Sequence, residues 1–214
     1  MEKFTLVIGN KNYSSWSLRP WLALTHFKIP FKEILIPLAR PESKAAVLKH
    51  SPSGKVPLLK HGKTIVWESL AICDYLADLF PSKNMWPKDK TKRAYGRSIA
   101  SEMHAGFFNL RKACPMNVRA RTPVALTPEV TKDVNRITAI WEDGRKKHGK
   151  SGNFLCGDFS IADAMFAPVV FRFRTYGIAV SGPAKKYMNA MLDLPAVKKW
   201  EEAALKETWV IERH

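Results

Sequence analysis

The chain has 214 residues, of which 46% are hydrophobic and 25% are charged, a balance typical of a globular protein with a substantial core. It contains no run of about 18 apolar residues, and its first residues lack the basic flank and apolar core of a secretory signal, so neither a membrane span nor a leader is expected. The net charge of +16 would suit a polyanion partner. Because no nucleic-acid motif accompanies the charge, we expect a solvated basic surface, or a field that attracts anionic substrates, and no nucleic-acid partner.

Three cysteines, Cys73, Cys114 and Cys156, are widely spaced and form no CxxC pair. An odd, sparse set argues against a disulfide framework and against dithiol redox chemistry. The pattern indicates a reducing compartment, so we expect a cytoplasmic protein whose cysteines are small packing residues.

The first 80 residues alternate between short apolar runs and helical patterns. The expected elements are a strand over 3–8, a helix over 16–27, a strand over 31–36, a helix over 41–49, hairpin strands over 57–60 and 63–66, and a helix over 68–79. The order βαβαββα predicts an α/β domain, a small mixed sheet with helices on its faces.

Residues 81–89 contain two prolines and no clear period, so they are expected to form a linker. The remaining residues, 90–214, are helical in pattern and predict an all-α domain. Its expected helices cover 91–114, 128–147, 160–174, 183–192 and 195–206, with a loop over 117–127. Ser160-Ile-Ala-Asp163 has the form of a capping box, with Asp as the acidic member.

The segment Asn12-Tyr-Ser-Ser-Trp-Ser-Leu-Arg-Pro-Trp21 lies between the first strand and the first helix. Ser14, Ser15 and Ser17 crowd this turn, where their hydroxyls and the free N–H groups of the first helical turn can converge on an anion. A thiolate is one such anion. The same serines would also serve as ordinary helix caps.

Two more segments of the first domain suggest a ligand site. A proline at a strand start cannot donate to the ladder, so a cis Val56–Pro57 bond would explain Pro57 and turn the Val56 backbone outward toward a peptide-like ligand. Glu68 and Ser69 begin a helix, where they can meet an ammonium and a carboxylate of a ligand. Plain helix capping is the alternative for this pair.

Together, the serine motif, Val-Pro-Leu-Leu59, Glu68-Ser-Leu-Ala-Ile-Cys-Asp-Tyr-Leu76 and the capping box resemble the glutathione transferase family. The resemblance covers nearly the whole chain and is nearest to the serine-type zeta and related bacterial classes. It implies a thioredoxin-like domain over 1–80, a linker over 81–89 and a helical domain over 90–214 that contributes the second-substrate site.

The resemblance also implies roles at the thiol end of glutathione. Ser14 matches the catalytic serine, whose hydroxyl would donate to the glutathione sulfur and favour the thiolate. Ser15 matches a neighbouring donor. Val56 matches the residue that pairs with the cysteinyl backbone, and Pro57 matches the cis-proline.

At the other ends of glutathione, Glu68 and Ser69 match the pair that holds the γ-glutamyl group. Lys55 lies where a basic residue would reach the glycine carboxylate. Asn109 falls near an amide that contacts glutathione in zeta-like members, although a polar residue on a helix surface is an equally good interpretation.

The sequence departs from the zeta motif at Trp16, which stands where that motif has Cys. This removes the thiol needed for mixed disulfides, disfavours thiol transfer and makes maleylacetoacetate isomerase activity a weaker expectation. Trp16 would instead line a second-substrate site between the domains.

The other residues expected to line that site are His104, Phe107, Phe108, Arg111, Arg172, Arg174 and Tyr176, although its aromatic members could equally belong to the core. Arg172 and Arg174 cannot both face one way on a helix, and the one facing the cleft would favour anionic electrophiles.

The expected function is therefore a cytoplasmic, homodimeric glutathione S-transferase that uses glutathione as co-substrate, without a metal, and conjugates it to a small, possibly anionic electrophile. One alternative is a glutathione-dependent cis-trans isomerase of the maleylacetoacetate type. Another is a transferase-fold interaction protein without chemistry.

Overall fold

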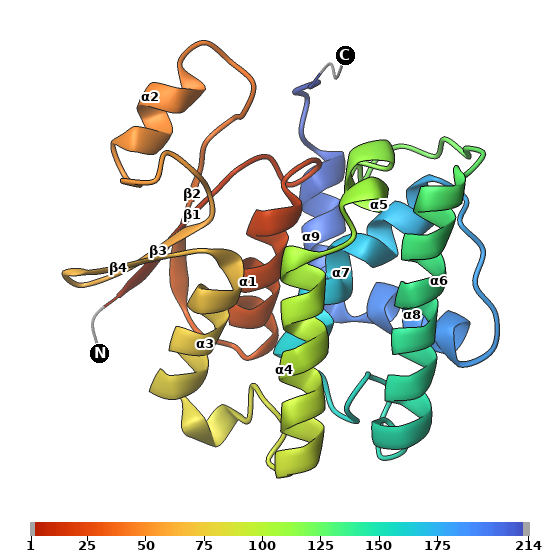
Figure 1. Ribbon diagram of the computed structural model, residues 1–214. Coiled ribbons are helices and arrows are strands. Elements are labelled where there is room, and N and C mark those ends of the chain that lie inside the picture. The colour runs from red at the N-terminus through yellow and green to blue at the C-terminus, as the bar shows by residue number, and fades with distance from the viewer. Residues whose placement is uncertain (1–2, 212–214) are drawn as a thin grey trace.

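The structure is a computed structural model and describes residues 3–211. A four-stranded sheet lies at one side of the molecule and a group of helices at the other (Figure 1). The strands are β1 (Phe4–Ile8), β2 (Phe31–Leu35), β3 (Leu58–His61) and β4 (Thr64–Trp67), in the spatial order β2-β1-β3-β4. β1 runs parallel to β2 and antiparallel to β3, and β3 runs antiparallel to β4. With α1 (Ser15–His26), α2 (Ser43–Leu48) and α3 (Ser69–Leu79), they confirm the predicted βαβαββα order.

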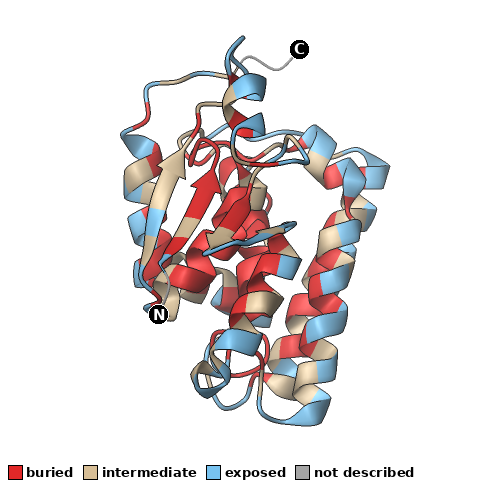
Figure 2. Cartoon of the chain, turned by 90° about the vertical axis from the view of Figure 1, so that its left-hand side faces the viewer, coloured by how far each residue is buried: buried red, intermediate tan, exposed pale blue. Residues whose placement is uncertain are grey.

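The sheet buries different side chains on its two faces, because successive residues of a strand point in opposite directions. Phe4, Leu6 and Ile8 of β1 join the main core with α1 and α3, whereas Val7 packs with Val47 of α2 on the other face. Figure 2 shows β1 as a largely buried strand of the sheet. α1 and α3 therefore lie between the sheet and the helical part of the chain (Figure 1).

The helical part confirms the predicted all-α unit. Its helices are α4 (Lys90–Ala105), α5 (Phe108–Ala113), α6 (Pro128–Asp143), α7 (Ile161–Thr175), α8 (Gly182–Asp193) and α9 (Pro195–Leu205), with a 3₁₀ turn over Pro81–Lys83 and a π-helical turn over Gly144–His148. Nearly every residue of α7 is buried, and this helix packs against both α1 and α4. α7 is therefore the centre of the helical unit.

The expected single helix over 91–114 was wrong, because the chain breaks between α4 and α5. Gly106 is extended and Phe107 adopts a left-handed conformation with φ 58°. The Leu110 N–H, in the first turn of α5, donates to the Asp133 carboxylate of α6 at 2.9 Å. A group contributed from another helix thus satisfies the start of α5, and the local sequence does not reveal it.

The predicted capping box is confirmed at the start of α7. The buried Asp163 carboxylate accepts the N–H groups of Ser160 at 2.8 Å and of Leu155 at 3.0 Å. Burial raises the pKa of Asp163 to about 6. Over residues 3–211, every helix is too short or too polar to cross a bilayer.

Candidate active site

The turn of residues 10–14, here called the serine turn, joins β1 to α1 and brings Ser14 to the N-cap of that helix. The Ser14 N–H donates to the Asn10 carbonyl at 2.8 Å, which closes the turn. The Ser14 hydroxyl donates to Ser17 Oγ at 2.7 Å, and the same oxygen accepts the Gly9 N–H at 3.1 Å. Ser14 is 7% exposed and lines a cavity. Its hydroxyl therefore lies at the positive end of a helix and at the edge of a space that a ligand can enter.

Two neighbouring cavities lie in this region, and Trp16 and Val56 line both of them, whereas only the larger one is lined by residues of the serine turn. The smaller has a volume of about 230 Å³ and is also lined by Ser53, Lys55, Pro57, Trp67 and Glu68. The larger has a volume of about 490 Å³ and is also lined by Tyr13, Ser14, Ser15, Leu38, Phe108, Arg111, Lys112, Met116 and Arg172. An extended ligand in the smaller cavity can thus reach the larger one past Trp16 and Val56.

The predicted cis peptide bond between Val56 and Pro57 is present, beside both cavities. Glu68 is the N-cap of α3 and has a left-handed backbone, with φ 67°, which is unusual for a residue with a side chain. Its side chain is 53% exposed, so its carboxylate is available to a ligand. Residues with such backbones cluster at functional sites.

Ser15 receives a hydrogen bond from the helical domain. Arg172 of α7 donates from Nη2 to Ser15 Oγ at 3.3 Å and from Nε to the Cys114 carbonyl at 2.9 Å. Arg172 is 4% exposed, and it lines the larger cavity. A buried guanidinium beside the serine turn favours an anion there, because charges interact strongly away from water.

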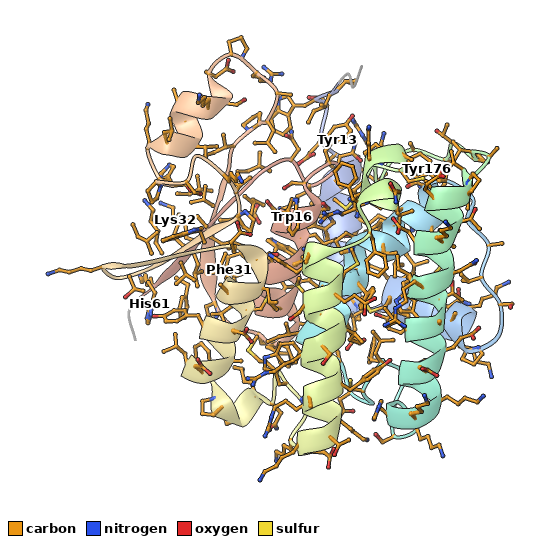
Figure 3. All side chains as sticks on the ribbon, in the orientation of Figure 1. Tyr13, Trp16, Phe31, Lys32, His61 and Tyr176 are labelled. Carbon is orange, nitrogen blue, oxygen red and sulfur yellow. The ribbon has the colours of Figure 1, made fainter. Side chains whose placement is uncertain are left out.

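Two guanidinium groups lie over the Trp16 ring. The Arg19 guanidinium lies 4.3 Å from its ring centroid and that of Arg111 lies 5.3 Å away. The His104 ring meets Trp16 edge-on at 5.2 Å. Trp16 thus connects α1 to α4 and α5, and Figure 3 shows it between the sheet side and the helical side of the molecule. Cation–π contacts of this kind fix the ring in place.

Arg19 of α1 is a buried cation next to Trp16 and Ser69. Burial, followed by repulsion from Arg172 and Arg111, lowers the pKa of Arg19 to about 9. Its Nη1 donates to the Ser69 hydroxyl at 3.4 Å, and its Nε has no hydrogen-bond partner among the described residues. Ser69 is therefore oriented by a charge, in the position expected to hold a carboxylate.

His104 of α4 lies beside Glu68, with Nε2 and Oε2 3.6 Å apart. Burial and the Arg19 charge lower the pKa of His104 below the ordinary 6.5, although Glu68 opposes that shift. Its carbonyl accepts a hydrogen bond from Arg111 Nη1 at 3.3 Å. His104 thus links the helical domain to the carboxylate expected to hold a ligand ammonium.

Other expected site residues lie elsewhere. Arg174 pairs with Glu201 of α9 through two hydrogen bonds at 2.5 and 3.0 Å. The Tyr176 hydroxyl donates to the Pro115 carbonyl at 2.8 Å, and Figure 3 shows this residue well apart from Trp16. Asn109 is exposed on α5, and Phe107 is buried at the helix break. None of these four lines the two cavities, so their ligand roles remain predictions.

Several lining residues were not predicted. They are Tyr13, Leu38, Ser53, Trp67, Lys112 and Met116. Tyr13 belongs to the serine motif and could have been found there. Leu38, Ser53 and Met116 lie in loops, Lys112 lies near the end of α5, and Trp67 ends β4; patterns in the sequence do not specify where the fold brings these residues. Among residues 3–211, no group of three or more His, Cys, Asp or Glu side chains could hold a metal ion.

Comparison with known proteins identifies the family. Residues 13–79 match the family model for the glutathione S-transferase N-terminal domain, and residues 124–203 match that for the C-terminal domain. The chain is 36% identical over 161 residues to glutathione S-transferase 1 of Dianthus caryophyllus, a match covering 74% of this chain and 68% of that protein. It is 29% identical over 187 residues to a protein named "Probable maleylacetoacetate isomerase" from Caenorhabditis elegans, a match covering 85% of each.

The fold agrees with this assignment. A solved structure of a glutathione transferase homologue from Burkholderia, with bound glutathione, matches with a TM-score of 0.71 at 20% identity, covering 97% of this chain and all of that one. The N-terminal matched segment supplies every described residue that lines the smaller cavity, and Arg172, which lines the larger one, lies in the C-terminal matched segment. The chain belongs to the glutathione S-transferase family.

Proposed function

We propose that this enzyme holds the glutathione thiolate at Ser14 and transfers it to a small anionic electrophile in the larger cavity. The observation that carries the proposal is the charge around the serine turn. Among the described residues that line the larger cavity, Arg111, Lys112 and Arg172 are cationic and none is acidic. Such a lining favours both a thiolate and an anionic second substrate.

Glutathione fits the smaller cavity as the co-substrate. The exposed Glu68 carboxylate in this cavity suits its ammonium. The adjacent Ser69, expected to hold the γ-glutamyl carboxylate, is fully buried, lines neither cavity and is oriented by Arg19, so that role stays a prediction. Val56 and Pro57 lie where the cysteinyl backbone would pass, and Lys55 lies in the same cavity for the glycine carboxylate. With the peptide so held, its sulfur points past Val56 toward Ser14.

In the proposed reaction the thiol loses its proton to solvent, and the Ser14 hydroxyl donates a hydrogen bond to the resulting thiolate. The sulfur then forms a bond to an electrophilic carbon, and the leaving group departs with its electron pair. If the electrophile carries an activated double bond, the sulfur bonds to one carbon, the π electrons move onto the activating group, and the resulting enolate takes up a proton from solvent, so no group leaves. One charge-directed hydrogen bond of this kind contributes about 1.5–3 kcal/mol.

Reversible addition supports a second candidate function, glutathione-dependent cis-trans isomerisation. It is favoured by the similarity to the protein from Caenorhabditis elegans named "Probable maleylacetoacetate isomerase" and by the cationic cavity, which suits a dicarboxylate. Incubation with maleylacetoacetate separates the two: isomerisation leaves the glutathione concentration unchanged, whereas conjugation consumes it. A protein that binds no glutathione would instead be a non-catalytic member of the family.

The Ser14→Ala variant tests the proposed role of the serine. We expect turnover with a chromogenic aryl halide or with maleylacetoacetate to fall by about 10- to 100-fold at pH 7, since about 1.5–3 kcal/mol of thiolate stabilisation is lost. The calorimetric affinity for glutathione should change by less than about threefold, because the peptide ends are held elsewhere. Equal losses of turnover and affinity would reject the role of Ser14.

We further propose that the protein is a cytoplasmic homodimer. Each chain would consist of a thioredoxin-like domain over residues 1–80, a linker over 81–89 and a helical domain over 90–214. Ile65 and Trp67 of β4 are 41% and 47% exposed, and apolar side chains at a sheet edge suit an interface. Sedimentation equilibrium tests the dimer: twice the mass of the chain is expected, and a monomer at micromolar concentration would contradict it.

A further inference from the structure

We propose that Glu207, in the tail after α9, is a positioning residue for the serine turn. Its carboxylate accepts two successive backbone N–H groups of that turn, from Lys11 at 2.6 Å and from Asn12 at 3.0 Å. These residues lie three and two positions before Ser14. The inference rests on the proposed function of Ser14 and explains how a distant part of the chain fixes that serine.

The Glu207 carboxylate is suited to holding two backbone N–H groups. Glu207 is 8% exposed, so its charge is largely removed from water. A carboxylate in such a place is costly unless its oxygens are hydrogen-bonded. Here each oxygen accepts one N–H group, and hydrogen bonds to a charged acceptor are short and strong. The turn is thus held at two adjacent backbone positions.

A second set of contacts ties the tail to the turn. Arg119 donates through its guanidinium to the Glu207 carbonyl and, at 2.7 Å, to the Trp209 carbonyl. The Arg119 backbone N–H donates to Asn12 Oδ1 at 2.9 Å, and Asn12 Nδ2 donates to Asn117 Oδ1 at 3.0 Å. Arg119 therefore fixes the direction of the tail that carries Glu207.

Lys11 anchors the other side of the turn. Its carbonyl accepts the indole N–H of Trp200 in α9 at 3.0 Å, and its Nζ pairs with Glu33 of β2 at 2.5 Å. The turn is consequently clamped between the sheet, α9 and the tail. Ser14, at its end, has little freedom other than rotation of its own side chain.

This arrangement predicts which step Glu207 supports. Ser14 acts on the sulfur of glutathione, whereas Glu68 and Ser69, on another segment, hold the far end of the peptide. Displacement of the serine turn would therefore weaken thiolate formation more than glutathione binding. Shifts of about 1 Å at a reacting group can reduce rates by about 100-fold.

The test compares Glu207→Gln with Glu207→Asp and with Glu202→Gln, a matched control on the exposed side of α9. Gln has the size of Glu, but its NH₂ group would face one N–H donor of the turn. The measurements are calorimetric titration of glutathione and the ultraviolet absorbance of bound thiolate as a function of pH. We expect the thiolate fraction at pH 7 to fall about tenfold in Glu207→Gln, with affinity within about threefold. Glu207→Asp, which keeps two acceptor oxygens, should lose less, and Glu202→Gln nothing.

Amide hydrogen exchange of the unliganded proteins is the second measurement. Exchange at Lys11 and Asn12 should speed up in Glu207→Gln while the amides of α9 keep their protection. Unchanged exchange at the turn, or an unchanged thiolate fraction, would overturn the role of Glu207. Parallel loss of affinity and thiolate would also overturn it and indicate general destabilisation. A failure of the unsubstituted protein to bind glutathione would instead overturn the proposed function, so the two failures are distinguishable.

Discussion

Ser14 must exchange hydrogen-bond partners to act on a thiolate. In the structure its hydroxyl donates to Ser17 Oγ, and that oxygen also accepts the Gly9 N–H. When Ser14 rotates toward a thiolate, Ser17 keeps the Gly9 hydrogen bond, so no buried donor is left unpaired. A neutral hydrogen bond contributes about 0.5–1.5 kcal/mol and one to a charged group about 1.5–3 kcal/mol, so the exchange favours the thiolate.

His104 should make glutathione binding depend on pH. Its pKa lies below 6.5, so it is neutral at pH 7 and leaves Glu68 free for the ligand ammonium. As the pH falls through that lowered pKa, His104 becomes a cation beside Glu68 and competes with the ammonium that Glu68 is proposed to hold. We expect the dissociation constant of glutathione to rise in acid, and to rise less in His104→Gln. Calorimetric titrations over a pH series measure this, and parallel curves for the two proteins would contradict it.

At the scale of elements, the start of α7 is the clearest case of a sequence signal that the fold uses. The capping box was predicted from Ser160 and Asp163, and the carboxylate also caps the Leu155 N–H of the preceding loop. The break between α4 and α5 was missed although Gly106, the C-cap of α4, is a local signal for it; the Asp133 carboxylate of α6, which accepts the Leu110 N–H at the start of α5, is distant in sequence. Local patterns thus predicted the start of α7, where the capping groups are close in sequence. They did not predict the start of α5, where the capping group is distant in sequence.

The Asp163→Ala variant should be among the most destabilising in the chain. It leaves two buried N–H groups without acceptors and removes a helix cap, so we expect a loss of about 2–4 kcal/mol in the free energy of unfolding. Urea denaturation followed by circular dichroism gives this quantity. Asp163→Asn retains one acceptor oxygen and should lose less. A change under about 1 kcal/mol in Asp163→Ala would show that the box is not needed for stability.

At the scale of the molecule, the sheet and the helices share one continuous core. Trp21 of α1 meets Trp200 of α9 edge-on, with centroids 5.1 Å apart, and the Lys11 ammonium lies over both rings. α1 also packs along α7. Separating the two halves would expose this surface, and the halves should therefore unfold together.

We accordingly expect a single thermal transition by calorimetry, with a van't Hoff enthalpy close to the calorimetric enthalpy of the cooperative unit. Trp200→Ala removes a side chain shared by both halves and should lower the midpoint of that one transition without splitting it. Two resolved transitions in the unsubstituted protein would contradict a shared core.

Much of the molecule could be predicted from its sequence, and the exceptions have a common cause. The strands, the hairpin and the cis-proline follow from local patterns, and Ser14, Trp16, Val56 and Glu68 do meet at two adjoining cavities. Arg19 and Glu207 were missed. In the sequence, nothing distinguishes Arg19 from other helical arginines; in the structure it is buried and hydrogen-bonded to Ser69. Glu207 accepts hydrogen bonds from the serine turn, and it lies 196 residues from Lys11 in the chain. Contacts of that span depend on the whole fold.

The most direct test of the proposed chemistry is the ionisation of bound glutathione, followed by thiolate absorbance as a function of pH in the unsubstituted protein and in Ser14→Ala. A free thiol has a pKa of about 8.5. We expect the bound thiol to ionise at least about one pKa unit lower in the unsubstituted protein, and close to the free value in Ser14→Ala. The same ionisation curve in both proteins would contradict the role of Ser14 in thiolate formation.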